Sequence, residues 1–284
     1  MKKITLTLIL SFFTAIGISC VAQNASPFQV TVTGKGKQAI LFIPGYSCSG
    51  DVWKETIQQL GPNYTSHVFT FAGFAGITPQ ANPSLNEWVQ AIGHYIQTQK
   101  LNKPIVVGHS LGGVAAMWLA SEYPDKIGKL IVVDALPCLT AIYNSNFQSQ
   151  ATPDCSAFIQ QFEKMDPQTF KTTQYTAMRS MVADTSKLET VVQWSLKSDK
   201  ATLGKIYCDF SNTDMREKIA AITCPSLILL EASFKAYQDT MNSQYKNLKT
   251  ARIEYSTKGL HFIMYDDKDW YYNQLRTFLS QGNF

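Results

Sequence analysis

The sequence predicts an α/β fold in which a mostly parallel central sheet is flanked by helices. Short apolar runs alternate with segments whose apolar residues recur at helical spacing. Each run is nearly unbroken in hydrophobicity, which is typical of parallel strands buried on both faces of a sheet. The 284 residues, of which 45% are hydrophobic, suffice for one domain, or for one domain that carries a sizeable insertion.

The first third of the chain supplies three strands and two helices of this pattern. The expected strands are residues 28–33, 39–43 and 66–71. The expected helices are residues 49–60 and 85–99. The strand at residues 39–43 stops at Pro44-Gly45, so a glycine turn follows its carboxyl end.

A serine lies at the tip of the next turn. The sequence GHSLGG, residues 108–113, follows the apolar strand at residues 104–107 and leads into an apolar helix that Pro124 ends. A Gly-x-Ser-x-Gly turn can hold its serine at strained backbone angles, because the flanking glycines avoid clashes. The hydroxyl of Ser110 then stands clear of the sheet, and the amide of Leu111 points toward an oxyanion formed beside it. The turn therefore indicates nucleophilic catalysis.

The alternation breaks after one more buried strand, residues 129–133, which Asp134 closes. Residues 138–213 lack a convincing buried strand and contain helical stretches such as residues 155–165. We expect residues 138–213 to form a helical lid inserted between the sixth and seventh strands. The core then comprises residues 23–137 and 214–284.

The sheet resumes near the C-terminus. The expected elements are strands at residues 225–230 and 251–255 and helices at residues 236–248 and 262–279. His261 falls in the loop between the last strand and the last helix.

The N-terminus predicts export. A positively charged start (MKK) precedes an apolar stretch over residues 4–18 and small residues up to Ala22. This order is typical of a secretory signal and too short for a persuasive membrane anchor. We expect residues 1–22 to be a signal peptide and the mature protein to be periplasmic or secreted. The alternative is a lipoprotein anchored through Cys20, because residues 17–20 loosely resemble a lipobox.

Composition argues against two other classes of function. A net charge of +4, with 16% charged residues and no basic run interleaved with aromatics, argues against a nucleic-acid partner. Four scattered histidines and no Cys-x-x-Cys spacing argue against a zinc site. An odd number of cysteines follows Ala22, so at least one thiol stays free or pairs elsewhere.

The candidate groups fall where an open parallel sheet collects its ligands, at the carboxyl ends of the strands. In the order of its strands, serine turn, insertion and histidine, the chain resembles the α/β-hydrolase fold family over nearly all of its mature length. The resemblance implies that Ser110 is the nucleophile, that His261 is the base, and that backbone amides of Leu111 and Tyr46 form the oxyanion hole. Pro44 replaces a histidine that many members carry, but the Tyr46 amide remains available.

The acid departs from the usual family pattern. Members commonly place an aspartate in a Gly-x-x-Asp pattern after the penultimate strand, whereas residues 230–235 read LEASFK. Other members carry the acid directly after the strand that follows the nucleophile helix, which is the place of Asp134. We therefore choose Asp134. Glu231 is an alternative, whereas Asp214 reads more like the N-cap of a short helix.

The implied reaction is acyl transfer, in which His261 takes the Ser110 proton and Ser110 attacks a carbonyl. We expect a hydrolase acting on a small-molecule carboxylic ester with a small or apolar acyl or alcohol group, without metal or cofactor. The aromatic residues within 71–76 and Tyr46 favour an apolar pocket. An aminopeptidase or thioesterase would use the same groups. A non-catalytic binding protein that kept the fold is the alternative from another class.

Overall fold

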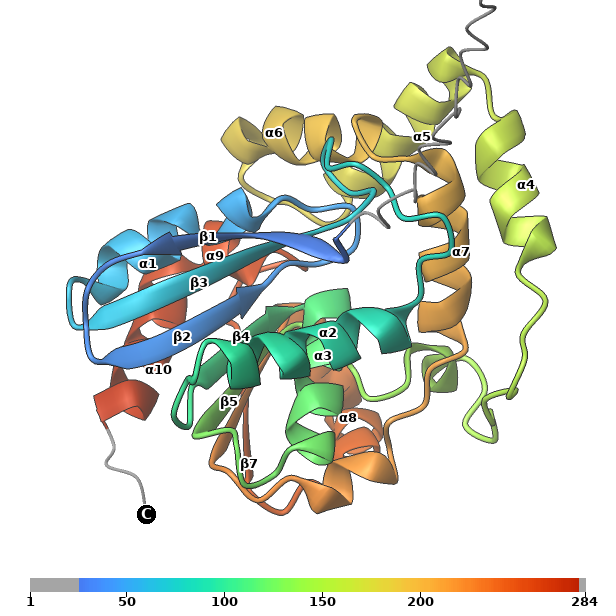
Figure 1. Ribbon diagram of the computed structural model, residues 1–284. Coiled ribbons are helices and arrows are strands. Elements are labelled where there is room, and N and C mark those ends of the chain that lie inside the picture. Colours follow the sequence, from blue (N-terminus) through green and yellow to red (C-terminus); the bar gives the residue numbers. More distant parts are fainter. Residues whose placement is uncertain (1–25, 281–284) are drawn as a thin grey trace, which may run out of the picture.

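A single sheet organises the computed structural model, which describes residues 26–280 (Figure 1). Its strands are β1 (Phe28–Thr33), β2 (Gln38–Ile43), β3 (Tyr64–Phe71), β4 (Ile105–His109), β5 (Lys129–Val133), β6 (Ser226–Leu230) and β7 (Ala251–Tyr255). Their order is β1-β3-β2-β4-β5-β6-β7, and β1 pairs antiparallel with β3 while the other pairs are parallel. The α/β prediction is confirmed. The predicted signal peptide, with Cys20, lies outside the described residues.

Helices cover both faces of the sheet (Figure 1). One face carries α2 (Leu85–Thr98), α3 (Leu111–Glu122) and α8 (Gln238–Tyr245). The other carries α1 (Lys54–Leu60), α9 (Ile263–Asp266) and α10 (Lys268–Ser280). Successive residues of a strand point to opposite faces, so Leu41 and Ile43 join the first core and Ile40 and Phe42 the second. Burial on both sides explains why these strands read as continuous apolar runs.

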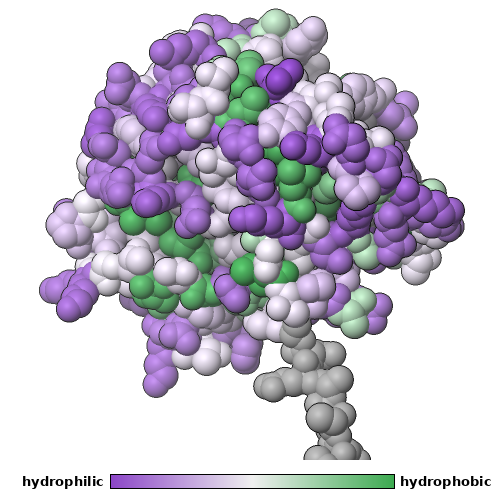
Figure 2. All heavy atoms as spheres, turned by 90° about the horizontal axis from the view of Figure 1, so that it is seen from above, coloured by the Kyte–Doolittle hydropathy of each residue, from purple (hydrophilic) through white to green (hydrophobic). Residues whose placement is uncertain are grey.

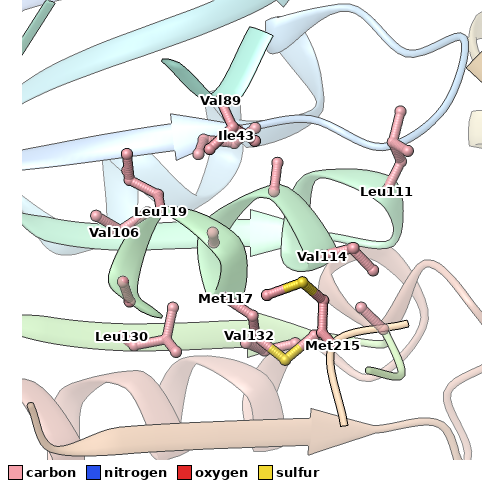
Figure 3. Close-up of a cluster of buried hydrophobic side chains, with 14 of the residues drawn as sticks. Ile43, Val89, Val106, Leu111, Val114, Met117, Leu119, Leu130, Val132 and Met215 are labelled. Carbon is pink, nitrogen blue, oxygen red and sulfur yellow. The ribbon is translucent and has the colours of Figure 1, made fainter. Parts of the chain in front are cut away.

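The helix after the serine turn is packed almost all round. Leu111, Val114 and Met117 of α3 lie among Ile43 and Val132 of the sheet (Figure 3). A Cβ added at Gly112 would lie 2.3 Å from the carbonyl oxygen of Ile43. Glycine therefore lets the first turn of α3 approach the backbone that follows β2.

The inserted helices, α4 to α7, separate β5 from β6. They are α4 (Ser156–Lys164), α5 (Pro167–Arg179), α6 (Thr185–Leu196) and α7 (Lys200–Ser211). The prediction of an insertion between the sixth and seventh strands is wrong, because only five strands of the sheet precede it along the described chain. Asp166, Asp184 and Asp199 cap α5, α6 and α7 with their side chains, so each aspartate ends the preceding loop.

The inserted helices form much of the upper face of the molecule. Hydrophilic side chains cover most of this face, and hydrophobic ones lie in several separate patches (Figure 2). A disulfide between Cys155 and Cys208, with Cα atoms 5.6 Å apart, joins the start of α4 to α7. None of the helices in the described part of the chain is long and apolar enough to cross a membrane.

The predicted last helix, residues 262–279, is divided into α9 and α10 at Asp267. Asp267 is 4% exposed, and its carboxylate accepts hydrogen bonds from the Ser256 hydroxyl (2.8 Å) and the Thr257 amide (2.9 Å). These hydrogen bonds join Asp267 to the two residues that follow β7, at the point where the helix is interrupted.

Candidate active site

Ser110 lies at the turn between β4 and α3 with φ 54° and ψ −123°. Few residues other than glycine adopt a positive φ, so the surrounding structure must hold this one. A Cβ added at Gly108 would lie 2.1 Å from the Gly112 carbonyl oxygen, which explains the glycine on each side. The Ser110 amide donates to the Val133 carbonyl at 2.9 Å and ties the turn to the end of β5. The serine side chain remains partly exposed.

The structure brings His261 and Asp134 together. Nδ1 of His261 lies 2.6 Å from Oδ2 of Asp134. Asp134 is 4% exposed, and its other oxygen accepts the Glu231 backbone amide at 2.7 Å. A carboxylate only accepts, so Nδ1 of His261 carries the shared proton and Nε2 is left to accept another. The carboxylate is therefore oriented by two bonds, one of them to the histidine.

His261 also lies beside the serine turn. Its ring centroid is 4.7 Å from that of His109, the residue directly before Ser110. Nε2 of His109 donates to the backbone carbonyl of His261 at 3.0 Å. These histidines are 152 residues apart in the sequence, and the turn motif alone predicts no role for the His109 side chain.

Asp266 holds the His261 loop from the other side. Its Oδ2 accepts the Leu260 amide at 3.1 Å. Its Oδ1 accepts the amides of Ala183 (3.0 Å) and Asp184 (2.9 Å), in the connection between α5 and α6. Sequence alone predicts no role for Asp266. Its signal there is an aspartate five residues after the candidate base, because Ala183 and Asp184 are 83 and 82 residues away.

The loop after β2 passes directly against the serine turn. A Cβ added at Gly45 would lie 3.2 Å from Cβ of Ser110 and 2.8 Å from Nδ1 of His109. The backbone of Tyr46 therefore lies next to Ser110. On the other side, Leu111 opens α3, and the first amides of a helix have no partners within it. The loop that carries Tyr46 and the first turn of α3 thus both adjoin the candidate nucleophile.

An aromatic row runs from this loop to the inserted helices, and we define it as Phe74, Tyr46, Tyr207 and Phe158. The Tyr46 ring centroid lies 5.4 Å from Phe74 and 5.9 Å from Tyr207, and Tyr207 lies 5.6 Å from Phe158. The Tyr46 hydroxyl donates to the Leu203 carbonyl of α7 at 2.8 Å. Burial raises the pKa of Tyr46 well above its usual value, and nearby Tyr207 adds to the shift. The Tyr46 phenol therefore stays protonated near neutral pH.

Two further contacts tie the inserted helices to this edge of the sheet. The hydroxyls of Ser47 and Ser195 lie 2.6 Å apart, which joins the β2 loop to α6. The amide of Asp199 donates to the Gly73 carbonyl at 2.7 Å, which joins the loop after β3 to the start of α7. Both ends of the α6–α7 connection are thus attached to the core beside the aromatic row.

The other two acid candidates have different partners. The Glu231 carboxylate accepts the Ser233 hydroxyl. Burial raises the pKa of Glu231, and the nearby Asp134 carboxylate adds to the shift. Asp214 pairs with the guanidinium of Arg216, at 2.9 Å to Nε and 2.6 Å to Nη2. Asp214 also accepts the Arg216 amide at 3.0 Å, and the short helix expected there is a 3₁₀ turn at Lys218–Ala221.

In the part of the chain that the structure describes, the cysteines outside the disulfide are poor nucleophiles. Within residues 26–280, Cys48, Cys138 and Cys224 are outside the disulfide and buried. Burial raises the pKa of Cys48 to about 12 and that of Cys224 to about 11, so both thiols stay protonated near neutral pH. No three of the His, Cys, Asp and Glu side chains in the same residues are grouped as metal ligands would be.

Comparisons with known proteins agree with this architecture. Residues 38–282 match the family described as alpha/beta hydrolase fold. Pimeloyl-acyl-carrier-protein methyl ester esterase of Aliivibrio fischeri is 23% identical over 266 residues, covering 87% of this chain and 95% of that protein. The protein of the same name from Edwardsiella ictaluri is 25% identical over 205 residues, covering 68% and 74%.

Solved structures show the same fold at lower identity. An enol-lactonase from Burkholderia xenovorans superposes with a TM-score of 0.73 at 12% identity, over 89% of this chain and 96% of that one. An esterase from Exiguobacterium antarcticum gives a TM-score of 0.72 at 18% identity, again over 89% and 96%.

Proposed function

This chain belongs to the alpha/beta hydrolase fold family, and we propose that it is an exported serine esterase that cleaves small-molecule esters with a small or apolar acyl or alcohol group. The observation that carries the proposal is the 2.6 Å contact between His261 and Asp134 next to the strained turn of Ser110. A buried acid that orients a histidine beside a partly exposed serine is the arrangement that activates a hydroxyl for attack.

The proposed reaction has two halves. Nε2 of His261 takes the Ser110 hydroxyl proton while Oγ attacks the ester carbonyl, and the amides of Leu111 and Tyr46 stabilise the oxyanion. When the intermediate collapses, the C–O bond to the alcohol breaks and His261 returns the proton to the leaving alcohol. A water molecule, deprotonated by the same nitrogen, then releases the acid from Ser110. Asp134 keeps the proton on Nδ1 and stabilises the imidazolium in both halves.

The aromatic row supports an apolar substrate group. Tyr46 carries the proposed donor amide. Its ring contacts Tyr207, which in turn contacts Phe158 of α4. A substrate group that extends from the reacting carbonyl along this row would contact aromatic side chains. The named activity of both curated relatives, hydrolysis of a methyl ester, supports an ester bond. We propose that residues 138–213 are the lid over this path.

The acidic residues of the inserted segment do not favour an aminopeptidase. Such an enzyme needs carboxylates to hold the substrate amine. Of the seven in residues 138–213, Asp184 and Asp199 cap helices, Asp209 pairs with Lys205, and Glu189 accepts the Tyr175 hydroxyl. The others are Asp154, Glu163 and Asp166. All three are exposed. Asp154 accepts the Ser156 amide at 2.9 Å, and Asp166 caps α5, so both serve local backbone.

Two observations support export. The first 22 residues read as a secretory signal. The disulfide between Cys155 and Cys208 is of a kind that persists in oxidising compartments.

The substrate class is tested with a panel of p-nitrophenyl esters at fixed pH. We expect kcat/KM for neutral butanoate to hexanoate esters to exceed that for dicarboxylic or amino-acid esters by about tenfold or more, since one or two buried methylenes contribute about 10–200-fold and a buried charge is unfavourable. Steady-state kinetics on the purified protein give the ratio. Turnover confined to amino-acid amides or thioesters would instead identify a peptidase or thioesterase, and no turnover would favour a binding protein.

A further inference from the structure

His109 is fully buried at the end of β4, where no side-chain role has been assigned to it. Its ring lies between three aromatic neighbours: the centroids of His261, Phe262 and Trp53 are 4.7, 4.8 and 6.4 Å away. Packing alone would be satisfied by an apolar side chain at this position. The two ring nitrogens of His109 are polar atoms in a buried environment, where a polar atom without a partner is unfavourable.

Only one of the two ring nitrogens has a partner. Nε2 lies 3.0 Å from the His261 carbonyl oxygen, and because a carbonyl only accepts, Nε2 carries the proton. Nδ1 is buried without a hydrogen-bond partner in the described structure and lies against Gly45. Burial lowers the pKa of His109 well below its usual value; repulsion from a protonated His261 adds to the shift, and the hydrogen bond to the His261 carbonyl opposes it. The ring is therefore neutral near pH 7, with its single N–H directed at His261.

We propose that His109 is a positioning residue that holds the backbone of His261 against the serine turn, so that the ring of His261 stays within reach of Ser110. Asp134 fixes the His261 ring from the end of β5, and His109 fixes the His261 backbone from the end of β4. Since Ser110 directly follows His109, the same residue sets the position of nucleophile and base. The inference rests on the proposed esterase function, because its consequence for rate requires Ser110 and His261 to react.

A matched pair of variants separates the hydrogen bond from packing. Glutamine places an N–H near the position of Nε2, whereas methionine has a similar length and volume but no donor. We expect His109→Met to lower kcat by about 10- to 100-fold with KM changed less than about twofold, since a displacement near 1 Å costs about 10²-fold. His109→Gln should recover kcat to within about threefold of the wild type.

The control uses another buried histidine of the same sheet. His67 on β3 is 5% exposed and contacts the Tyr95 hydroxyl at 2.8 Å, and none of its described contacts is with His261. His67→Met makes the same chemical change and should leave kcat per titrated active site unchanged. Active-site titration corrects each variant for its folded fraction, so a variant that only unfolds shows fewer sites with the wild-type kcat.

A spectroscopic readout makes the test independent of turnover. The proton between His261 and Asp134 gives a downfield ¹H NMR resonance, which we expect to shift or broaden in His109→Met and to persist in His109→Gln. An unchanged resonance and unchanged kcat per site in His109→Met would overturn the proposal. If the wild type turns over no ester and the resonance still responds to His109→Met, the esterase function is rejected and the positioning role is retained.

Discussion

Ser110→Ala is expected to lower kcat for the best neutral ester by about 10⁶-fold, the loss found when the serine of a comparable triad is removed. Alanine lacks the oxygen that forms the acyl-enzyme. It keeps the Cβ, so the backbone strain at φ 54° and the packing of the turn should change little. Steady-state kinetics and thermal unfolding of the same preparation measure the two effects separately.

A serine on the same helix provides the control. The Ser121 hydroxyl donates to the Trp118 carbonyl within α3 at 2.8 Å. Ser121→Ala should leave kcat within about twofold, as for a substitution away from the reacting groups. A Ser110→Ala protein that retains more than about 1% of the wild-type kcat would contradict the assignment, since the expected residual kcat is about 10⁻⁶ of the wild-type value.

Asp134→Asn is expected to lower kcat by about 10⁴-fold. An asparagine amide can donate to Nδ1 of His261, which favours the tautomer with the proton on Nε2. That nitrogen then cannot accept the Ser110 proton. Asp134 has φ 47°, and asparagine tolerates this region well, so the fold should persist. The pH-independent kcat of the folded variant is the measurement.

Glu231→Gln is the matched control for this change. It removes the neighbouring carboxylate but leaves the Glu231 backbone amide that Asp134 accepts at 2.7 Å. We expect kcat to fall by less than about tenfold, because the bond to His261 is kept. A larger loss in Glu231→Gln than in Asp134→Asn would make Glu231 the acid.

The features predicted from sequence are those that local pattern determines. Continuous apolar runs revealed the parallel sheet, and the family resemblance is confirmed by the match over residues 38–282. Gly108 faces the Gly112 carbonyl within the turn itself, so five consecutive residues are enough to explain this glycine. The position of His261 after the last strand predicts that it lies at the carboxyl edge of the sheet, where it contacts Asp134.

The features that sequence did not settle depend on contacts between distant segments. The partner of His261 lies 127 residues away, so pattern alone left Asp134, Glu231 and Asp214 open. Cys155 and Cys208 are 53 residues apart, and no spacing rule selects that pair. The break at Asp267 follows from hydrogen bonds to the residues after β7, which helical periodicity does not register.

The most direct test of the account is chemical labelling of the serine. The purified protein is incubated with a fluorophosphonate probe, and the modified peptide is mapped by mass in the wild type, Ser110→Ala and His261→Ala. The account predicts one labelled site, Ser110, in the wild type and none in either variant, because only a hydroxyl activated by the histidine attacks phosphorus at a useful rate. A well-folded wild type that resists labelling, or a Ser110 label that persists in His261→Ala, would contradict it.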